Sequence, residues 1–379
     1  MANFQDYINA LHSGTLKRKL KIELLRPDET IREEITSLIS NTNGSLSVKR
    51  NNGIRRGCSF DIFNLDNKYI PNPENFYINQ KFILNLGLEM PDGTDFYLPQ
   101  GIFILDDPLV SSAFSESLIS ISGVDKFSLL NGDLGGEIGY VYIINIGTDV
   151  SQAIKSVLAL SGDTKQPIID VSLVGLKTPY TMTYQPSDTL GKIIVDLAQL
   201  YSCSCFYNEI GQLEIVKDVD DNIKSSLWDF STPQFVYQGG SNQFKWSEMY
   251  NSCRVVGSNI DGVDVSYKTQ NLNLLSPTSI PNLNGLERTY FYQTDTISTV
   301  QQCIDLSEYI LKRKTAVQNS IQINSLAMFH LNPDEIITLT DSKLGLDKER
   351  FLINDFSLQF NNGGTLSINA IKSKEIPFI

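Results

Sequence analysis

Two adjacent arginines open the stretch of this sequence with the clearest capacity for chemistry. Arg55 and Arg56 stand just ahead of Cys58 and the strand-like run "SFDIFNLDNKYI". Guanidinium groups bind phosphates and carboxylates, and a thiol can act as a nucleophile. Neighbouring side chains of a strand point to opposite faces, so the two arginines cannot hold one anion unless Gly57 makes the backbone irregular. The pattern predicts a paired or solvated strand entry; the sharper hypothesis is an ion pair between subunits or domains for one arginine.

The histidines argue against a catalytic relay or a histidine metal site. His12 and His330 are the only two, and they lie near opposite ends of the chain. A Ser/His/Asp relay and most zinc sites need a histidine beside its partner groups. We therefore expect no such chemistry, and we expect His330, in the strand-like run "AMFHL", to be a partly buried structural residue.

The cysteines favour free thiols in a reducing compartment, because they are odd in number and widely scattered. Cys203 and Cys205 point to one face if their segment is a strand. They could form half of a metal site or a redox pair, but the sequence holds no second Cys/His pair with zinc spacing. Dithiol chemistry normally uses Cys-x-x-Cys, so we expect both in a core. The five cysteines are Cys58, Cys203, Cys205, Cys253 and Cys303.

Two carboxylate clusters are candidates for a cation site or for acid/base work. Asp218, Asp220 and Asp221 lie in "KDVDDN" and could bind Ca²⁺, but the glycine and distal glutamate of a calcium loop are missing. We expect a solvated turn after the strand "QLEIV". Asp106 and Asp107 are expected to end a strand, and their spacing leaves a glycosidase pair open.

A glycine-rich segment, "GDLGGEIG" at 132–139, is the nearest approach to a phosphate loop. It carries acidic residues at positions where a phosphate site needs hydrogen-bond donors. We therefore interpret it as a flexible connection between domains. The sequence therefore assigns no catalytic, cofactor-binding or metal-binding residue, and no cofactor.

Size and charge narrow the class of protein. The chain has 379 residues, of which 41% are hydrophobic, and a formal net charge of −12. This length favours two or three domains. The acidic balance argues against binding nucleic acid by neutralising phosphates, but it suits a surface past which DNA slides. The sequence has no run of 18 apolar residues and no secretory pattern at its start, which predicts no membrane segment and synthesis in the cytosol.

The period of the hydrophobic pattern changes along the chain and predicts a mainly β protein with an α+β insert. Short runs with period two, separated by turn residues, predict small antiparallel barrels, whereas helical spacing marks 150–160 and 187–201. A hairpin is expected around Glu209-Ile210-Gly211. The predicted parts are an N-terminal helix at 1–14, a first β-barrel tube domain at 15–125, a helix-plus-hairpin domain at 126–235, and a second barrel at 236–379 with an insertion near 261–296 and a helix at 297–315.

The order of these stretches resembles the baseplate or tail hub proteins of contractile phage tails and related particles. "RRGCSFDIFNLDNKYI", "KFILNLGLEMPDG" and "PQGIFILDDP" look like the first barrel of such hubs. "YNSCRVVG", "VQQCIDLSEYILKRKT", "LNPDEIITLTD", "RFLINDFSLQF" and "GGTLSINAI" look like the second. The resemblance covers most of 15–130 and 240–375.

This resemblance implies a structural, non-enzymatic protein of the virion tail, assembled in the host bacterial cytoplasm. Such hubs are homotrimers in which two barrels per chain form a pseudo-hexameric ring. The ring joins the hexameric tail tube to the trimeric central spike and lines the channel for DNA ejection. The implied partners are the tail-tube protein, the spike, and baseplate wedge or tape-measure proteins, with transient non-specific passage of DNA.

Two other classes are kept as alternatives. A tail-associated cell-wall-degrading enzyme would usually carry an appended hydrolase domain, and this sequence stops at "KEIPFI" after the second predicted barrel. A glycan-binding receptor protein would favour exposed tryptophan and tyrosine platforms, but only Trp228 and Trp246 are present. Peptidoglycan release and glycan-binding assays separate both from a hub.

Overall fold

The structure is a computed structural model of the chain. It describes residues 3–12, 16–73, 76–114, 117–217, 223–231, 234–258, 264–294, 297–315, 318–326, 328–360 and 364–372. Within these ranges the protein is mainly β, as predicted, and its strand pairs are mostly antiparallel. The four α-helices are α1 Phe4–His12, α2 Val150–Leu160, α3 Leu190–Gln199 and α4 Val300–Lys314. In the described part, no helix has the length and apolar character needed to cross a membrane.

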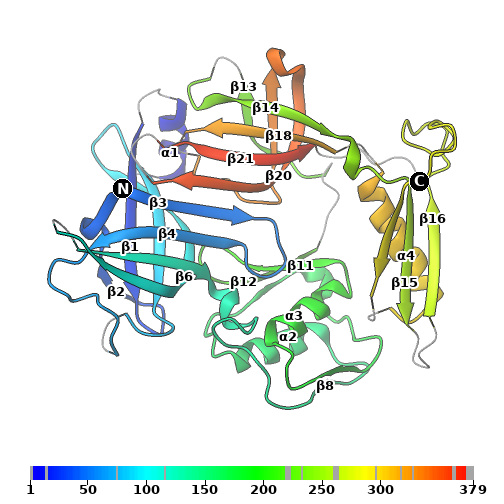
Figure 1. Ribbon diagram of the computed structural model, residues 1–379, viewed down its shortest axis with the longest axis horizontal. Coiled ribbons are helices and arrows are strands. Elements are labelled where there is room, and N and C mark those ends of the chain that lie inside the picture. Colours follow the sequence, from blue (N-terminus) through cyan, green and yellow to red (C-terminus); the bar gives the residue numbers. More distant parts are fainter. Residues whose placement is uncertain are drawn as a thin grey trace.

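One large sheet collects strands from both ends of the chain (Figure 1). Its N-terminal strands are β1 Lys17–Leu25, β2 Ile31–Glu34, β3 Ile39–Lys49, β4 Arg56–Phe63, β5 Lys81–Glu89, β6 Asp95–Ser112 and β7 Ser117–Asp125. Its C-terminal strands are β13 Ser226–Ser231, β14 Tyr237–Lys245, β18 Gln318–Ser325, β19 Ile336–Asp341, β20 Leu346–Gln359 and β21 Leu366–Lys372. The order is β14-β18-β21-β20-β3-β4-β7-β6-β5-β1-β2, and β19 joins β13 to β20.

The two halves of this sheet are hydrogen-bonded to each other through β3 and β20, where Leu46 pairs with Leu358 and Val48 with Phe356. Alternation explains the buried face, since Phe60 of β4 points inward while Ser59 is exposed. One continuous apolar core underlies both halves. Among the described residues no sheet closes on itself, so the strand pairings do not establish the predicted barrels.

The N-terminal helix α1 covers part of this core. Its residues Tyr7, Ala10 and Leu11 are buried, which fits the helical spacing of the apolar residues in this segment. The backbone amide of Phe329 donates to the Tyr7 hydroxyl at 2.8 Å, so the helix is tied to the C-terminal half of the sheet.

A separate α+β module, here called the middle module, spans residues 126–217 and has its own core. Helices α2 and α3 pack together in the lower part of Figure 1. The predicted hairpin around Glu209-Ile210-Gly211 is present between β11 and β12. The module begins with the 3₁₀ helix η2 Lys126–Leu129 and contains β8 Tyr142–Ile144, β9 Ile168–Ile169, η3 Val171–Leu173, β10 Met182–Tyr184, β11 Cys203–Tyr207 and β12 Leu213–Lys217.

The middle module contains an internal repeat with an offset of 40 residues, which the sequence reasoning missed. Strand β8 precedes α2 as β10 precedes α3, and β8 pairs with β10. The contacts at the helix starts are also equivalent, since Val150 N donates to Leu176 O at 2.9 Å and Leu190 N to Gly136 O at 2.8 Å. The only sequence signal is the weak match of "GTDVSQAIKSVLAL" to "SDTLGKIIVDLAQL".

The glycine-rich segment at 132–139 is not the flexible connection that the sequence predicted. Gly132 N donates to Gly135 O at 2.8 Å, and Leu134 N donates to Ser128 O at 3.1 Å. A Cβ atom at Gly136 would lie only 2.5 Å from the backbone of Leu130. The glycines therefore permit close packing at the base of the repeat rather than freedom of movement.

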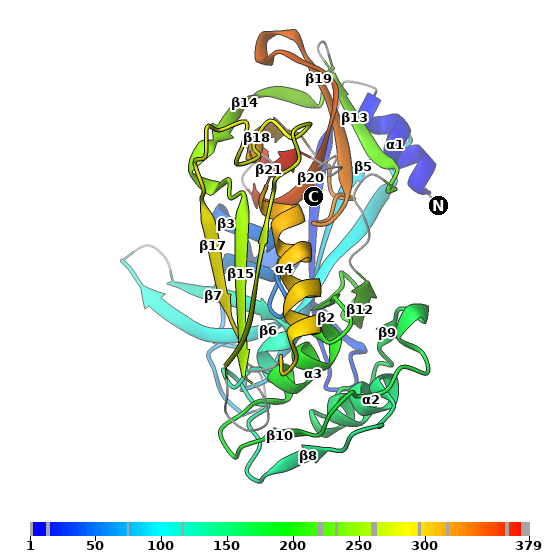
Figure 2. The same cartoon turned by 90° about the vertical axis from the view of Figure 1, so that its right-hand side faces the viewer.

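A third unit, here called the α4 unit, stands apart from the large sheet on the right of Figure 1 and along the near side of Figure 2. It contains β15 Ser252–Ser258, β16 Asp264–Gln270 and β17 Thr289–Gln293, with helix α4 packed on β15 and β16. The segment "YNSCRVVG" and this helix were predicted inside the second barrel, and that placement is corrected here. A strand pattern shows that a segment pairs but does not show with which partner.

Candidate functional site

The opening arginine segment lies where the large sheet meets the middle module. It connects β3 to β4, and its Gly53 forms an isolated bridge with Phe206 of β11. Gly53 N donates to Cys205 O at 2.9 Å, and Cys205 N donates to Asn52 Oδ1 at 3.1 Å. Backbone hydrogen bonds therefore join the two parts directly beside Arg55.

Arg55 is buried, with 5% of its surface exposed. Its Nη2 lies 2.8 Å from Asp334 Oδ2, and its guanidinium carbon lies 3.4 Å from the centre of the Phe206 ring. Arg50 contacts the other oxygen of Asp334 at 2.5 Å. Burial lowers the pKa of Arg55, and the charge of Asp334 opposes that shift. The side chain thus bridges the middle module and the loop before β19.

Arg56 is buried as well, and it points to a different set of partners. Its Nη1 donates to Gln100 O at 2.9 Å and its Nη2 to Asn332 Oδ1 at 2.7 Å. Glu209 Oε2, in the β11–β12 turn, lies 3.6 Å from Nη2. Burial lowers the pKa of Arg56, opposed chiefly by Glu209. One guanidinium therefore contacts both halves of the large sheet and the middle module.

Asp125 holds the backbone of both arginines. Its Oδ2 accepts from Arg55 N at 2.7 Å and from Arg56 N at 2.9 Å, and its Oδ1 accepts from Phe127 N at 3.0 Å, which caps η2. Burial raises the pKa of Asp125 to about 6, against the lowering effect of these three amides. This carboxylate joins the end of β7 to the start of β4.

Both arginines form ion pairs with carboxylates that are remote in sequence, Arg55 with Asp334 and Arg56 with Glu209. The hypothesis of an interdomain ion pair for one arginine is confirmed by Arg56, because Glu209 belongs to the middle module. Of the paired or solvated strand entry that the pattern predicted, the paired form is present, since Arg55 and Arg56 are 5% and 3% exposed. A buried guanidinium loses hydration that only ion pairs and hydrogen bonds can offset. Their carboxylate partners lie far along the chain, so no local pattern could reveal the burial.

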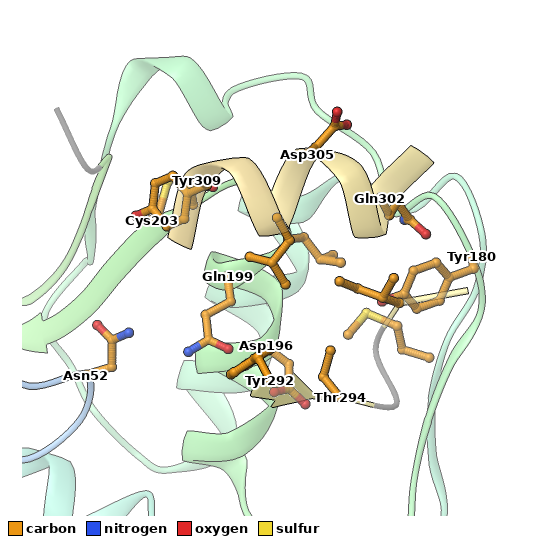
Figure 3. Close-up of a pocket in the computed structure, with 15 residues that line it drawn as sticks. Asn52, Tyr180, Asp196, Gln199, Cys203, Tyr292, Thr294, Gln302, Asp305 and Tyr309 are labelled. Carbon is orange, nitrogen blue, oxygen red and sulfur yellow. The ribbon is translucent and has the colours of Figure 1, made fainter. Parts of the chain in front are cut away.

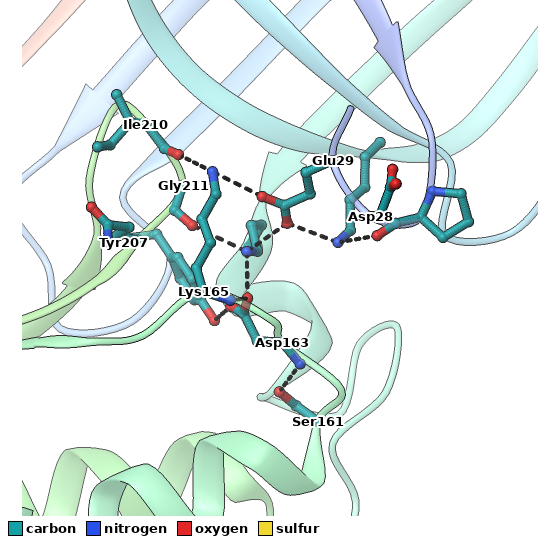
Figure 4. Close-up of polar contacts among 12 residues, drawn as sticks. Asp28, Glu29, Ser161, Asp163, Lys165, Tyr207, Ile210 and Gly211 are labelled. Atoms are coloured by element: carbon teal, nitrogen blue, oxygen red, sulfur yellow. Dashed lines mark hydrogen bonds and ion pairs between the residues drawn. The ribbon is translucent and has the colours of Figure 1, made fainter. Parts of the chain in front are cut away.

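A second buried charge cluster joins the same two parts (Figure 4). Glu29, in the turn between β1 and β2, contacts Lys81 at 2.8 Å and Lys126 at 2.7 Å through Oε1, and Lys165 at 2.9 Å through Oε2. Burial alone would raise the pKa of Glu29, but the three lysines outweigh it and lower the value to about 2. The carboxylate therefore stays charged. We call Glu29, Lys81, Lys126, Asp163 and Lys165 the lysine cluster.

Lys126 lies at the centre of this cluster, with 1% of its side chain exposed. Its ammonium group contacts Asp163 Oδ1 at 2.8 Å and donates to Gly211 O at 3.0 Å. The Tyr207 hydroxyl donates to the other oxygen of Asp163 at 2.7 Å. The sequence reasoning missed the cluster, since its members come from separate segments without a shared motif. Every carboxylate in it is paired with a lysine, so the arrangement fixes positions and offers no unpaired base.

A cleft of about 560 Å³ lies between the middle module and the α4 unit (Figure 3). Its lining residues include Asp196 of α3, Tyr180, Tyr292 and Tyr309, and also Asp305 of α4, whose carboxylate points away from the others in Figure 3. Burial raises the pKa of Asp196, and nearby Lys192 lowers it. The lining residues include no histidine, lysine or arginine, so the cleft offers carboxylates and aromatic rings without a cation to pair with them.

The two histidines, remote in sequence, both pack against Trp228. His12 is stacked on the ring at 5.0 Å, and His330 lies edge-on at 5.7 Å. The Tyr7 hydroxyl is 3.2 Å from His330 Nδ1, and burial lowers the pKa of His330 to about 4. The prediction that His330 is a partly buried structural residue is confirmed.

The cysteines are free and buried, as predicted. Cys203 and Cys205 lie on the inward face of β11, and burial raises the pKa of the Cys205 thiol far above its ordinary value. A buried thiol is a poor nucleophile because its thiolate is disfavoured.

The carboxylate candidates show no cation site. Asp106 and Asp107 do not end a strand; they sit at a bulge inside β6, where Asp107 has φ 32°. Asp218, Asp220 and Asp221 lie outside the described residues. Over the described ranges, no group of three or more His, Cys, Asp or Glu side chains is arranged to hold a metal ion.

Comparisons with known proteins identify the fold. No protein-family model matches the chain, and no curated protein matches its sequence. The 43 kDa tail protein of prophage MuSo2 from Shewanella oneidensis is similar, with a TM-score of 0.64, 12% identity, and coverage of 94% of this chain and 98% of that one. A tail protein from Neisseria meningitidis gives 0.64, 10%, 95% and 97%.

The prophage tail protein gp18 from Listeria monocytogenes is similar as well, with a TM-score of 0.58, 9% identity, and coverage of 94% and 95%. These matches span almost the whole of each chain, so all three units of the present structure belong to the shared fold. The resemblance to phage tail and baseplate hub proteins is thereby confirmed in the fold.

Proposed function

We propose that this chain, which has the fold of phage tail proteins, is a structural hub of a phage tail or baseplate. The observation that carries the proposal is the near-complete, two-way coverage by three tail proteins. A likeness limited to one sheet would point only to a common barrel type. Here the large sheet, the middle module and the α4 unit are all included.

The proposed hub is a homotrimer that adapts sixfold to threefold symmetry. The two halves of the large sheet, β1 to β7 and the C-terminal strands, would act as two tube domains in each chain. Three chains then present six tube domains in a pseudo-hexameric ring. The direct pairing of β3 with β20 supports this arrangement, because it holds the two halves of each chain side by side. We retain the proposed limits of 1–14 and 15–125 and shorten the proposed middle domain 126–235 to 126–217, because β13 lies in the large sheet. The proposed second tube domain, 236–379, would then gain β13 and be interrupted by the α4 unit.

The contacts of Arg55, Arg56 and the lysine cluster, here called the charged junction, would fix the middle module against the tube domains. Arg56 pairs with Glu209 of the module, Lys126 and Lys165 of the module pair with Glu29, and Arg55 lies over the Phe206 ring. Charged hydrogen bonds are directional, whereas apolar contacts tolerate sliding. A hub that must hold a tube and a spike in register needs such a defined orientation.

The proposed partners are the tail-tube protein on one side and the central spike on the other, with baseplate wedge or tape-measure proteins around the ring. The protein would act in the virion tail after assembly in the host cytoplasm. The net charge of −12 suits a channel that DNA crosses without adhering, because acidic walls repel phosphates.

The enzymatic and glycan-binding alternatives have less support. Glu29, Asp163 and Asp334 are held in ion pairs and Asp125 accepts from three backbone amides, while Trp228 is buried against His12 and His330. Trp246 is exposed, but a single ring is a small platform for a glycan. Activity in a peptidoglycan-release or glycan-array assay would favour these alternatives over a hub.

The decisive experiment is the mass and shape of the purified chain. Light scattering is expected to give three chains per particle, and negative-stain images along the threefold axis should show a central hole. A stable monomer at all concentrations, with no assembly on adding the spike protein, would overturn the proposal.

A further inference from the structure

The loop between β16 and β17 has an unusual composition and no assigned role. Residues 271–286 read "NLNLLSPTSIPNLNGL" and carry no charge, in a chain with 31 basic and 43 acidic residues. Surface loops of an acidic protein are normally rich in charged side chains. Figures 1 and 2 place this loop at the outer end of the α4 unit. An uncharged surface loop calls for an explanation.

Buried asparagines hold this loop in one conformation. Asn251, fully buried, donates from Nδ2 to Thr278 O at 3.2 Å and to Leu286 O at 2.9 Å, and its Oδ1 accepts from Arg288 N at 2.7 Å. Its own carbonyl accepts from Asn271 N at 2.8 Å. One residue, through its side chain and its carbonyl, therefore connects both ends of the loop to its middle.

Asn271 extends this network to helix α4. It is fully buried, and its Nδ2 donates to Ser276 Oγ at 2.8 Å and to Thr315 Oγ1 at 2.7 Å. Thr278 Oγ1 also donates to Thr315 O at 2.5 Å. Because Thr315 ends helix α4, the loop is fixed to a regular element. Four polar residues of the loop are buried, namely Asn271, Ser276, Thr278 and Ser279.

The leucines of the same loop point outward. Leu274 and Leu275 are 71% and 77% exposed, and Leu272 and Leu286 are also exposed. A loop that is held by buried hydrogen bonds and exposes several leucines presents fixed apolar side chains to a partner. We call Leu272, Leu274, Leu275 and Leu286 the leucine loop.

A second uncharged apolar surface lies on the middle module. Residues 138–148, "IGYVYIINIGT", carry no charge. Within the described part, β8 pairs only with β10, which leaves its other edge unpaired. An exposed apolar edge strand is a ready docking site. The exposed residues, here called the β8 face, are Tyr140, Val141, Ile143 and Ile146.

We propose that the leucine loop of one copy docks on the β8 face of a second copy of this chain. The proposal rests on the proposed homotrimer and names its contact. Two copies with a net charge of −12 each repel one another, so uncharged surfaces are where they can approach. In both views (Figures 1 and 2) the loop between β16 and β17 lies in the upper half of the molecule and β8 lies at its lower end. A contact between two different surfaces repeats head to tail and can close into a ring.

Substitution of exposed leucines tests the contact without disturbing the fold. The double variant Leu274→Asp and Leu275→Asp places two carboxylates on the leucine loop. We expect the concentration for half-assembly of the trimer to rise at least about tenfold, with unchanged circular dichroism. The matched control is Leu65→Asp, because Leu65 is 78% exposed in a distant turn. Equal assembly of the double variant and the wild type would overturn the proposal.

Cross-linking tests which surfaces meet. Leu275→Cys and Ile143→Cys proteins are mixed and treated with a short bismaleimide, with Leu65→Cys in place of Leu275→Cys as the control. The five native cysteines are buried and serve as an unreactive background. A cross-link between the two variants, absent from the control, is expected. Cross-linking of the Leu275→Cys protein only to itself would show a twofold contact and overturn the proposal.

The two proposals fail in different ways. A trimer that gives no cross-link, or that assembles equally well with both leucines replaced, overturns this inference and leaves the proposed hub intact. A wild-type chain that is monomeric at all concentrations overturns the proposed hub, and the inference falls with it.

Discussion

Replacing Glu29 by glutamine is the sharpest test of the lysine cluster. The change keeps the shape of the side chain but removes the negative charge that faces Lys81, Lys126 and Lys165. Asp163 is then the cluster's remaining carboxylate. Breaking a buried ion pair by removing one partner costs about 3 to 5 kcal/mol. We expect a loss of that order in the free energy of unfolding at pH 7.

The pH dependence of the free energy of unfolding gives a second, independent value for the contribution of Glu29. The pKa of Glu29 falls from 4.5 to about 2 in the folded protein, a difference worth about 3 kcal/mol. A carboxylate with a lowered folded pKa stabilises the protein above its unfolded pKa, and that stability is lost as the pH falls through the folded value. The wild-type protein should therefore lose this amount between about pH 4.5 and pH 2. The Glu29→Gln variant should lack that part of the slope.

Urea denaturation followed by circular dichroism at pH 7 and pH 3 measures both effects. The matched control is Glu34→Gln, because Glu34 is an exposed carboxylate of the neighbouring strand β2. We expect the control to stay within about 0.5 kcal/mol of the wild type at pH 7. If Glu29→Gln behaved like the control and its stability fell in parallel with the wild type on acidification, the assignment of the lysine cluster as a buried lock would be wrong.

Three further predictions concern the junction and the loop. Arg55→Ala and Arg56→Ala should each lower the free energy of unfolding by about 3 to 5 kcal/mol, because both guanidinium groups are buried in ion pairs. Variants that form normal trimers with unchanged stability and salt sensitivity would show that these ion pairs do not hold the parts of the chain together. Burial raises the pKa of Glu335, in the loop before β19, from 4.5 to about 7. Its stabilising contribution is complete below the unfolded value and is lost as the pH rises from about 4.5 to 7. Glu335→Gln should flatten that fall in urea titrations, and identical slopes would refute the assignment. Asn271→Ala should speed hydrogen exchange across 272–286, since each unpaired buried polar group costs about 1 to 3 kcal/mol; unchanged exchange would show that the loop is held by other contacts.

Local patterns account for the elements that the sequence could predict. Helices α2 and α4 follow from an apolar stripe and from caps at Asp149 and Thr299. Strand β4 follows from alternation, and the hairpin at Glu209 from its turn residues. Each depends on residues within a few positions of one another, which is the range over which a sequence pattern carries information.

The charged junction could not be predicted in the same way. Arg55 and Asp334 are separated by most of the chain, and nothing near either residue marks it as buried. The same holds for Glu29 and Lys126, which look like ordinary surface charges in sequence. The placement of β15 failed for a related reason, since its parallel partner β17 lies beyond the loop.

The distribution of charge connects these findings into one account of assembly. Within the chain, the middle module is joined to the large sheet by the buried ion pair of Lys126 with Glu29 and by the contact of Arg55 with the Phe206 ring. Such pairs add little net stability but strongly penalise any misaligned arrangement. The surfaces proposed to meet between copies, the leucine loop and the β8 face, carry no charge. Burial of apolar surface favours association without requiring an oppositely charged partner. An acidic chain built in this way would fix its own shape by charge and join its neighbours by apolar burial. Salt screens buried ion pairs little and the repulsion between acidic copies strongly, so added salt should favour the ring while leaving the junction almost unchanged.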